Sequence, residues 1–405
     1  MKNGGINLAN NYPVVLIHGM FGWGDGEILN DIFPYYGMIT GSLEKRLRAE
    51  GIRCFAPKVG PAAGAWDRAC ELWAMFKGGT VDYGEAHSKK YGHERFGRTY
   101  PIPMIPDWGL KDENGDLVKV HLFGHSFGGA TMREFVHLLE DGCQEEVEMS
   151  GDNVSPLFKG GKGNWVCSVT SLAAPHDGTT LVHALPGMMA ALRYATFAVS
   201  NILGNTCFNK FYDLHMEQFG LTSIPGKNNR YDQLFNIKGV LHAAQSHDNL
   251  VWDLRIDGAN ELNKNLHPCK DIYYFSVPTL GTKDGPEGRP VPGRIMNPLL
   301  MPFANVMAKN DFSGKFDYCE IDKSWLHSDG LVPLGSSEAP QHEPHMLLKD
   351  ADKNNLQKGI WHVTSPAESD HGTIVGGSLD YIGFGKHKIV DKYYMDHIKL
   401  LQTLK

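Results

Sequence analysis

The 405-residue sequence lacks several features that would assign it to a specialised class of protein. No stretch approaches the roughly 18 uninterrupted apolar residues of a membrane-spanning helix, so we expect no transmembrane segment. There is no dense run of lysine and arginine, and the net charge of -7 gives no support to nucleic-acid binding or to a basic membrane-surface patch. Internal repeats and low-complexity tracts are also absent. The remaining composition, 42% hydrophobic and 21% charged, is that of a globular protein.

Cysteine is sparse and unpatterned. The seven cysteines are scattered and include no C-x-x-C pair, so neither a disulfide framework nor a cysteine zinc site is expected. Because the number is odd, at least one thiol is free in a monomer, as in a reducing setting or among buried apolar cysteines. The first residues, MKNGGINLANN, lack the apolar segment of a signal peptide, which says little about export.

Short apolar runs alternate with helical patterns along the chain. Helical spacing over residues 41–51, and again directly after residue 126, separates runs that are typical of buried strands. Strands that alternate with helices predict an α/β fold with a mostly parallel, doubly wound sheet, in one domain over residues 1–405. The expected strands are 12–18, 52–59, 117–126, 165–175 and 271–278.

Residues 177–268 interrupt this alternation. They include ALPGMMAALRYATFAVSNILGN (184–205), a long and mostly apolar helical segment. An insertion of this size between two strands predicts a helical cap or lid over the carboxyl edge of the sheet. An ordinary crossover helix with a long loop is the alternative.

The motif Gly124-His125-Ser126-Phe127-Gly128 matches G-x-S-x-G and lies between an apolar run and a helical pattern. A tight strand-to-helix turn strains the serine backbone and requires small flanking residues, because the strand and the helix nearly touch. We therefore predict that Ser126 is a nucleophile; an incidental serine in a glycine-rich turn is the alternative. LIHGMFGWG follows the first expected strand, so the amides of Met20 and Phe127 are the expected oxyanion donors, with His18 as a structural residue.

A serine hydrolase of this design also needs a carboxylate and then a histidine further along the chain. WLHSDGLVPLGS contains Asp329, and SDHGTIVG contains His371. The histidine would accept the serine proton and return it to the leaving group, while the carboxylate fixes its tautomer. Asp370 directly precedes His371 and could not easily orient its ring. From spacing alone, the remaining competitors for these roles are Asp322, His345 and His362.

The stretch VDYGEAHSKKYGHERFGRTYP contains two histidines six positions apart, His87 and His93. Six helical steps of about 100° leave them about 120° out of phase, so they cannot share one face of a regular helix. Gly92 between them would permit a bend, and two imidazoles with two carboxylates would make a closed zinc site. His-x5-His is no recognised metal spacing, so surface histidines are the simpler interpretation.

Taken together, these stretches resemble the thermoalkalophilic bacterial lipases of the Geobacillus type, which are related to the staphylococcal lipases. The resemblance implies an α/β-hydrolase fold with a two-helix lid, and hydrolysis of acylglycerols and simpler carboxylic esters. Residues 185–230 and 280–315 match poorly. The stretches that match are PVVLIHG, WDRACELW, GGTVDYGEAHSKKYGHERFGRTYP, GHSFGG, PHDGTTLV, DLRIDGANELN, IDKSWLHSDGLV and the DH pair at 370–371.

The resemblance also assigns roles to individual positions. It implies a structural zinc on a zinc-binding excursion at 61–100, closed by four protein ligands that leave no open position. It further raises a calcium site, which we do not expect because Thr373 stands at one acidic ligand position and the next acid is Asp380. The implied triad is Ser126, Asp329 and His371, with Met20 and Phe127 as oxyanion donors. The implied zinc ligands are Asp67, His87, His93 and Asp253, with Asp248 and Asp257 as alternatives to the last.

These inferences predict a lipase or carboxylesterase that acts through an acyl-enzyme intermediate on a lipid or ester substrate, with transient contact with a lipid surface. Within that class, an esterase for bulky or polymeric substrates such as polyesters is the alternative. The same triad would also serve an amidase or thioesterase. A non-catalytic, lipid-binding relative of the same fold is the alternative from another class. Secretion is expected from the resemblance alone.

Overall fold

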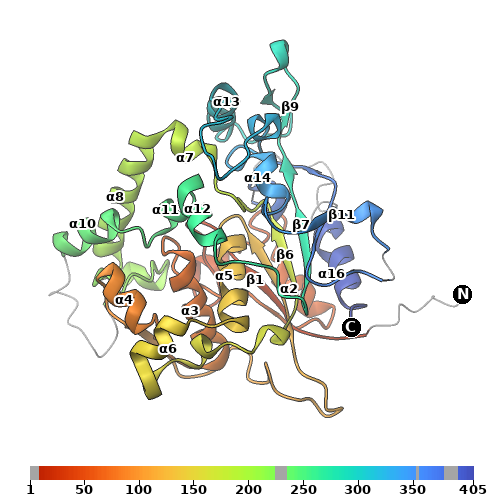
Figure 1. Cartoon of the computed structure of the whole chain (residues 1–405). Helices are drawn as coiled ribbons and strands as arrows, with labels where there is room; N and C mark the ends of the chain where they lie inside the picture. Colours follow the sequence, from red (N-terminus) through yellow and green to blue (C-terminus); the bar gives the residue numbers. More distant parts are fainter. Residues whose placement is uncertain (1–8, 224–234, 353–354, 378–390) are drawn as a thin grey trace, which may run out of the picture.

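A computed structural model describes residues 9–223, 235–352, 355–377 and 391–405. Its centre is a seven-stranded sheet in the order β11-β12-β7-β6-β5-β1-β2, in which every neighbouring pair is parallel (Figure 1). The strands are β1 (Val14–Ile17), β2 (Cys54–Phe55), β5 (Val120–His125), β6 (Val166–Leu172), β7 (Tyr273–Val277), β11 (His345–Leu347) and β12 (Trp361–Val363).

The four central strands are buried along their whole length, which explains their apolar sequences. Alternate residues of β1 face opposite layers: Val15 and Ile17 join one core cluster, and Val14 and Leu16 join the other. The expected strand at 52–59 is reduced to the two residues of β2. β11 and β12 were not expected, because each has only three residues and no apolar run.

Helices cover both faces of the sheet, as a doubly wound fold requires. Helices α3 (Ala65–Lys77) and α5 (Gly128–Glu140) pack side by side against one core cluster, and α2 (Leu43–Ala49) and α16 (Asp396–Leu401) pack against the other. The other α-helices are α1 (Ile28–Ile32), α4 (Glu85–Tyr91), α6 (Gln144–Ser150), α7 (Thr180–Ala184), α8 (Pro186–Leu203), α10 (Ile237–Gln245), α11 (Leu250–Asp253), α12 (Ile256–Asn263), α13 (Met301–Lys309) and α14 (Leu334–Glu338).

Residues 61–100 leave the sheet and return to it. After α3 they form an antiparallel pair, β3 (Gly79–Asp82) and β4 (Phe96–Tyr100), with α4 between the two strands. Gly92 ends α4 at φ +72°, a left-handed conformation that suits glycine, and its N–H donates to the Ser88 carbonyl. The chain therefore bends between His87 and His93. Two more short pairs complete the strands of the described residues: β8 (Thr279–Leu280) with β13 (Ala367–Glu368), and β9 (Thr282–Lys283) with β10 (Val291–Pro292).

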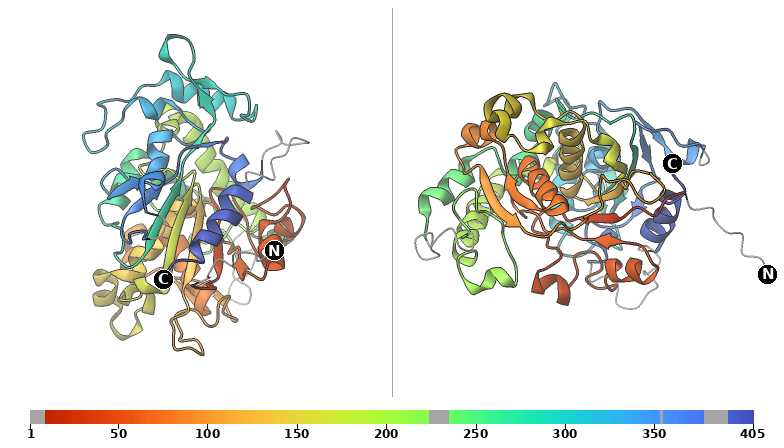
Figure 2. Two further views of the ribbon diagram at one scale, coloured as in Figure 1. Left: turned by 90° about the vertical axis from the view of Figure 1, so that its right-hand side faces the viewer. Right: turned by 90° about the horizontal axis from the view of Figure 1, so that it is seen from below.

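The chain between β6 and β7 contributes helices α7, α8, α10, α11 and α12. Helix α8 lies within the predicted helical segment 184–205, and Figures 1 and 2 place α8 and α10 on one flank of the molecule. α8 leaves apolar side chains exposed, among them Val199 and Ile202. That this segment acts as a cap stays a prediction. Among the described helices, none is both long and apolar enough to cross a membrane.

Candidate active site and metal centre

Ser126 occupies a sharp turn between β5 and α5. Its φ is +55°, a region that residues other than glycine rarely adopt. A Cβ atom on Gly124 would lie 2.4 Å from the Gly128 carbonyl oxygen, and one on Gly128 would lie 2.4 Å from the Ile17 carbonyl oxygen. Both positions therefore require glycine, as the motif predicts. Strain of this kind persists only where the surrounding structure enforces it, and it concentrates at functional sites.

The loop after β1 touches the serine turn. A Cβ atom on Gly19 would lie 2.8 Å from the Ser126 Cβ atom. The amides of Met20 and Phe127 donate no hydrogen bond within the described part of the chain. Phe127 also precedes the first residue of α5, where the helix dipole is positive. The two amides are thus available for a developing oxyanion.

His18 supports this loop. Its Nε2 atom accepts a hydrogen bond from the Val59 amide at 3.2 Å, so Nδ1 carries the proton and donates to the Gly19 carbonyl at 2.8 Å. Burial and the nearby Arg68 guanidinium lower the pKa of His18 to about 3. The ring is therefore neutral and fully engaged, in agreement with a structural role.

Asp329 and His371 lie side by side, with the His371 Nδ1 atom 2.8 Å from Asp329 Oδ2. The same carboxylate accepts hydrogen bonds from the Thr279 hydroxyl at 2.6 Å and from the amides of Leu331 and Val332 at 3.0 and 2.9 Å. Burial opposes ionisation of Asp329, yet the His371 imidazole and these hydrogen bonds lower its pKa below the ordinary value. An ionised carboxylate held in this way fixes the His371 ring.

The competing residues are occupied elsewhere. The Asp322 side chain caps a short 3-10 helix by accepting from the Ser324 amide, and the His362 ring faces the Tyr274 carbonyl inside the sheet. His345 is exposed on the edge strand β11. Asp370 accepts from the backbone and hydroxyl of Thr373, so it does not orient the His371 ring.

A chain of hydrogen bonds joins the oxyanion loop, the serine turn and the histidine. The Gly19 amide donates to the Tyr35 hydroxyl at 3.0 Å, the hydroxyl faces His125 Nδ1 at 2.7 Å, and His125 Nε2 faces the His371 carbonyl at 2.9 Å. Burial and the adjacent His371 hold the pKa of His125 well below its ordinary value, so the ring is neutral, and Nε2 donates while Nδ1 accepts. The Ser126 hydroxyl itself has no hydrogen bond among the described residues, and such contacts often close only when substrate binds. No motif pointed to Tyr35.

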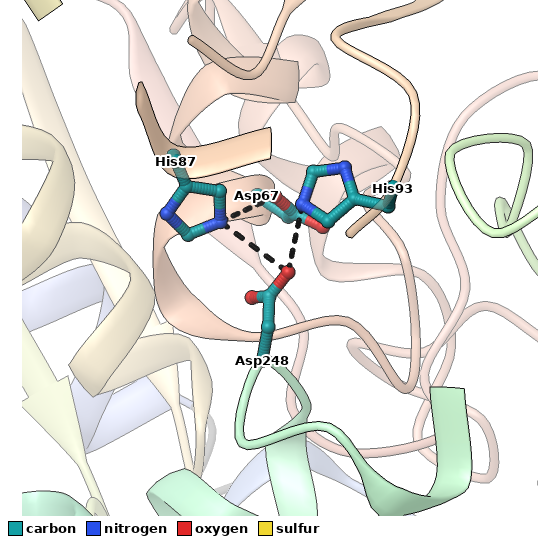
Figure 3. Close-up of side chains that lie close together, drawn as sticks. All are labelled: Asp67, His87, His93 and Asp248. Atoms are coloured by element: carbon teal, nitrogen blue, oxygen red, sulfur yellow. Dashed lines mark ion pairs between the residues drawn. The ribbon is translucent and has the colours of Figure 1, made fainter. Parts of the chain in front are cut away.

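Four further side chains, Asp67, His87, His93 and Asp248, converge on one point (Figure 3). We call them the buried Asp–His group. His87 Nε2 lies 3.4 Å from Asp67 Oδ1 and 3.3 Å from Asp248 Oδ2, and His93 Nε2 lies 3.1 Å from the same Asp248 oxygen. Each of these four atoms is buried without a hydrogen-bond partner, and all lie within 4.8 Å of one another. Unpartnered buried polar atoms are costly, so this donor set fits a shared cation.

Neighbouring residues orient these side chains. The Gln218 amide donates to Asp67 Oδ2 at 2.7 Å, and His93 Nδ1 faces the Glu94 carbonyl at 2.9 Å. The Trp66 ring stacks on His87 with centroids 4.8 Å apart and an interplanar angle of 7°. Outer contacts of this kind fix which nitrogen faces a metal. Burial would lower the pKa of His87, but the Asp248 and Asp67 carboxylates raise it to about 10. The two carboxylates therefore stabilise a positive charge in the buried Asp–His group.

Asp253, the predicted fourth ligand, is not among the side chains that converge, and Asp248, one of its predicted alternatives, lies there instead. Asp253 is the last residue of α11, and its Oδ2 atom accepts a hydrogen bond from the Ala65 amide at 2.8 Å. Asn249 caps α11, so Asp248 lies in the turn before the helix and points toward the histidines. The other alternative, Asp257, is paired with Arg255 at 2.6 Å.

At the position considered for calcium, the Thr373 hydroxyl donates to Asp370 Oδ1 at 2.7 Å. Threonine supplies no carboxylate there, and calcium sites usually include several. Asp380 lies outside the described residues.

The chain is similar to known lipases and esterases. Residues 10–403 match the family described as "Lipase-like, C-terminal domain". Lipase 2 of Staphylococcus aureus is 33% identical over 95% of this chain and 53% of its own length; Lipase 1 of the Mu50 strain is 34% identical over 91% and 51%. The chain thus spans about half the length of these curated relatives.

Solved structures give the same result. EstA from Clostridium botulinum has a TM-score of 0.79 at 36% identity and covers 99% of this chain and 89% of its own. Staphylococcus hyicus lipase has a TM-score of 0.80 at 29% identity over 99% of both chains, and lipase 1 from Pelosinus fermentans has 0.75 at 34% over 95% and 99%. These similarities confirm the α/β-hydrolase fold and the relation to staphylococcal lipases, whereas the Geobacillus-type likeness stays a prediction.

Proposed function

The chain belongs to the family of lipase-like C-terminal domains, and we propose that it is a serine hydrolase of carboxylic esters. The observation that carries the proposal is the strained Ser126 turn combined with the Asp329–His371 pair. A turn that only reverses the chain would need neither a strained serine nor two backbone amides without hydrogen-bond partners. It would also not need His371, whose ring Asp329 orients and whose carbonyl is bonded to the residue before the serine.

In the proposed reaction, the Ser126 hydroxyl attacks the ester carbonyl while His371 accepts its proton. The amides of Met20 and Phe127 donate to the oxyanion of the tetrahedral intermediate. His371 then protonates the departing alcohol, which leaves an acyl-enzyme. A water molecule, deprotonated by His371, attacks this acyl group and releases the acid and the free serine. Throughout, ionised Asp329 offsets the positive charge that forms on His371.

A hollow of about 350 Å³ lies between the oxyanion loop and α8 and supports an apolar acyl chain or alcohol as part of the substrate. Helices α1 and α8, which both contribute to its lining, also carry exposed apolar residues, among them Ile28, Ile32 and Val199, and these would suit transient contact with a lipid surface. Acylglycerols and bulky or polymeric esters both fit this description. The hollow is lined by Phe21, Trp23, Leu29, Leu192, Ala195, Thr196, Val199, Leu203, Tyr212 and Leu214.

The buried Asp–His group is proposed to hold zinc. Four protein ligands close the coordination sphere, so the metal would be structural and take no part in ester chemistry. It would tie α3, the turn after α4 and the segment before α11 to one point. The four buried, unpartnered donor atoms support this proposal. Secretion stays a prediction of the resemblance.

The decisive variant is Ser126→Ala. We expect turnover of p-nitrophenyl esters to fall by about 10⁴-fold or more, and covalent labelling by a fluorophosphonate probe to disappear, while zinc content and Tm stay unchanged. Ser337→Ala is the control, because its buried hydroxyl only donates to the Leu334 carbonyl. A Ser126→Ala chain that still turns over esters would sink the assignment. Wild-type protein that resists labelling would instead indicate a non-catalytic lipid-binding protein.

The acyl preference needs a separate measurement. A series of esters of increasing chain length, assayed below and above their solubility limits, separates the two substrate classes. A rise in rate when an emulsion forms indicates a lipase. A preference for short soluble esters, together with release of acid from a polyester film, indicates the alternative esterase.

A further inference from the structure

A second group of metal-ligating side chains lies on the surface, apart from the buried Asp–His group. It consists of His137, Asp141 and His267, which we call the surface His–Asp group. His137 Nδ1 lies 3.0 Å from Asp141 Oδ2, and His267 Nε2 lies 3.4 Å from the same oxygen. The three ligand atoms lie within 4.8 Å of one another.

Two different segments supply this group. His137 and Asp141 are four residues apart at the end of α5, a spacing that brings side chains onto one face of a helix. His267 comes from the segment between α12 and β7. Its Nδ1 atom faces the Asn265 carbonyl at 3.4 Å, which turns Nε2 toward Asp141. The Arg133 guanidinium, which donates to the Asn263 side chain at 2.8 Å, already holds the two segments together.

The electrostatic setting favours a cation. Asp141 is the C-cap of α5, where the helix dipole is negative and a carboxylate is unfavourable without a counter-charge. Glu134 lies one turn before His137, and both side chains line one cavity at the surface. It is only 5% exposed and makes no hydrogen bond or ion pair within the described part of the chain. Two carboxylates therefore flank His137, and in the described part of the chain the ion-pair partners of Asp141 are the two histidines, with no lysine or arginine among them.

We propose that His137, Asp141 and His267 bind a divalent transition-metal ion such as zinc at an exposed, exchangeable site. Imidazole nitrogen and carboxylate oxygen suit such ions. Three protein ligands leave a position open to water, in contrast to the closed buried group. Because the side chains of Asp141 and His267 are 41% and 56% exposed, the ion would bind more weakly than in the buried group and would exchange with the solution. Once bound, it would fasten the segment after α12 to α5.

The alternative is a simple hydrogen-bonded cluster in which both imidazoles share the Asp141 carboxylate. In that case no metal is taken up at this position, and the geometry reflects only attraction between the imidazoles and the carboxylate. A metal titration distinguishes the two, because a metal ion replaces the protons on the nitrogen atoms that face Asp141.

The test starts from the full chain loaded with one equivalent of zinc, which is titrated with further zinc in a calorimeter while Tm is followed in parallel. We expect a second, weaker equivalent accompanied by a rise in Tm. His267→Ala should weaken the second step by more than about 100-fold, since even outer partners of a ligand are worth about 10–100-fold. This exposed residue can be replaced without disturbing the core.

Two further variants complete the test. His342→Ala removes an exposed histidine outside the group and should retain both binding steps. Asp248→Asn, prepared without metal, should lose the tight step and keep the weaker one, so a failure of the buried site is distinguishable from a failure of this proposal. A wild-type chain that binds no second equivalent, or a second step that survives His267→Ala, overturns it.

Discussion

The serine turn and the buried Asp–His group are unfavourable in isolation for different reasons. At Ser126 the cost lies in the backbone, whose φ of +55° is imposed by glycines packed against carbonyl oxygens. In the buried group the cost lies in the side chains, because two imidazole nitrogens and two carboxylate oxygens are buried with no hydrogen-bond partner.

This difference determines what can relieve each cost. Only the fold can hold the serine turn, because the packing of β5 against α5 offsets its backbone strain. The buried Asp–His group can be relieved from outside, by a cation that satisfies all four atoms together. We therefore expect substitutions in the active site to change catalysis at nearly constant stability, and substitutions in the buried group to do the reverse.

Asp329→Asn is expected to have the largest effect on activity. It tests whether catalysis and stability depend on different regions of the molecule. The amide keeps the shape of the carboxylate but cannot stabilise the correct His371 tautomer or its positive charge, so kcat should fall by about 10⁴-fold. Zinc content should not change. Steady-state ester kinetics and metal analysis measure the two quantities. Asp322→Asn, which alters only the cap of a short 3-10 helix, should stay within about threefold of wild type.

The next largest effect should distinguish the two aspartates considered for the buried group. Asp248→Asn should weaken zinc binding by more than about 100-fold and lower Tm. Asp253→Asn should leave zinc affinity within about twofold of wild type, because in the described part of the chain the hydrogen bond to the Asp253 side chain comes from the Ala65 amide and not from the histidines. Competition with a chromophoric chelator measures both affinities. If Asp253→Asn abolishes binding and Asp248→Asn does not, the structural assignment of the fourth ligand is wrong.

The smallest effect concerns Tyr35, which links the oxyanion loop to His125. Tyr35→Phe removes one hydroxyl from the hydrogen-bond chain, and a typical bond of about 0.5–1.5 kcal/mol corresponds to a loss of about twofold to thirteenfold in kcat. KM should change little, because the hydroxyl positions catalytic groups and does not contact substrate. Tyr36→Phe is the matched control: its hydroxyl donates to the Ile17 carbonyl, so its loss should lower Tm more than kcat.

The contrast between the two regions also explains what the sequence could predict. Ser126, Gly124 and Gly128 are neighbours in the chain, so one motif contains both the residues and the strain. Asp329 and His371 were less determined by the sequence. Spacing alone left Asp322, His345 and His362 as competitors, and the resemblance selected Asp329 and His371. The contacts of the three competitors agree with that selection.

The buried Asp–His group depends on tertiary structure. The bend at Gly92 was foreseen as a means of bringing His87 toward His93, and φ +72° there provides it. Asp253 was predicted as the fourth ligand, whereas Asp248, five residues earlier, lies in the buried Asp–His group, because the start of α11 decides which aspartate faces inward. Asn249 is a typical N-cap and could have indicated that boundary. Tyr35 could not have been found from any local pattern.

Helix α8, which belongs to the predicted cap, ends close to an exposed cysteine. All seven cysteines lie within the described residues, and only Cys207, in the short 3-10 helix that follows α8, is exposed. Burial raises the pKa of the other six thiols, which keeps them in the unreactive protonated form. A maleimide dye or a spin label would therefore attach at one place in the unmodified chain. The protein thus provides its own spectroscopic handle next to the helix of the predicted cap.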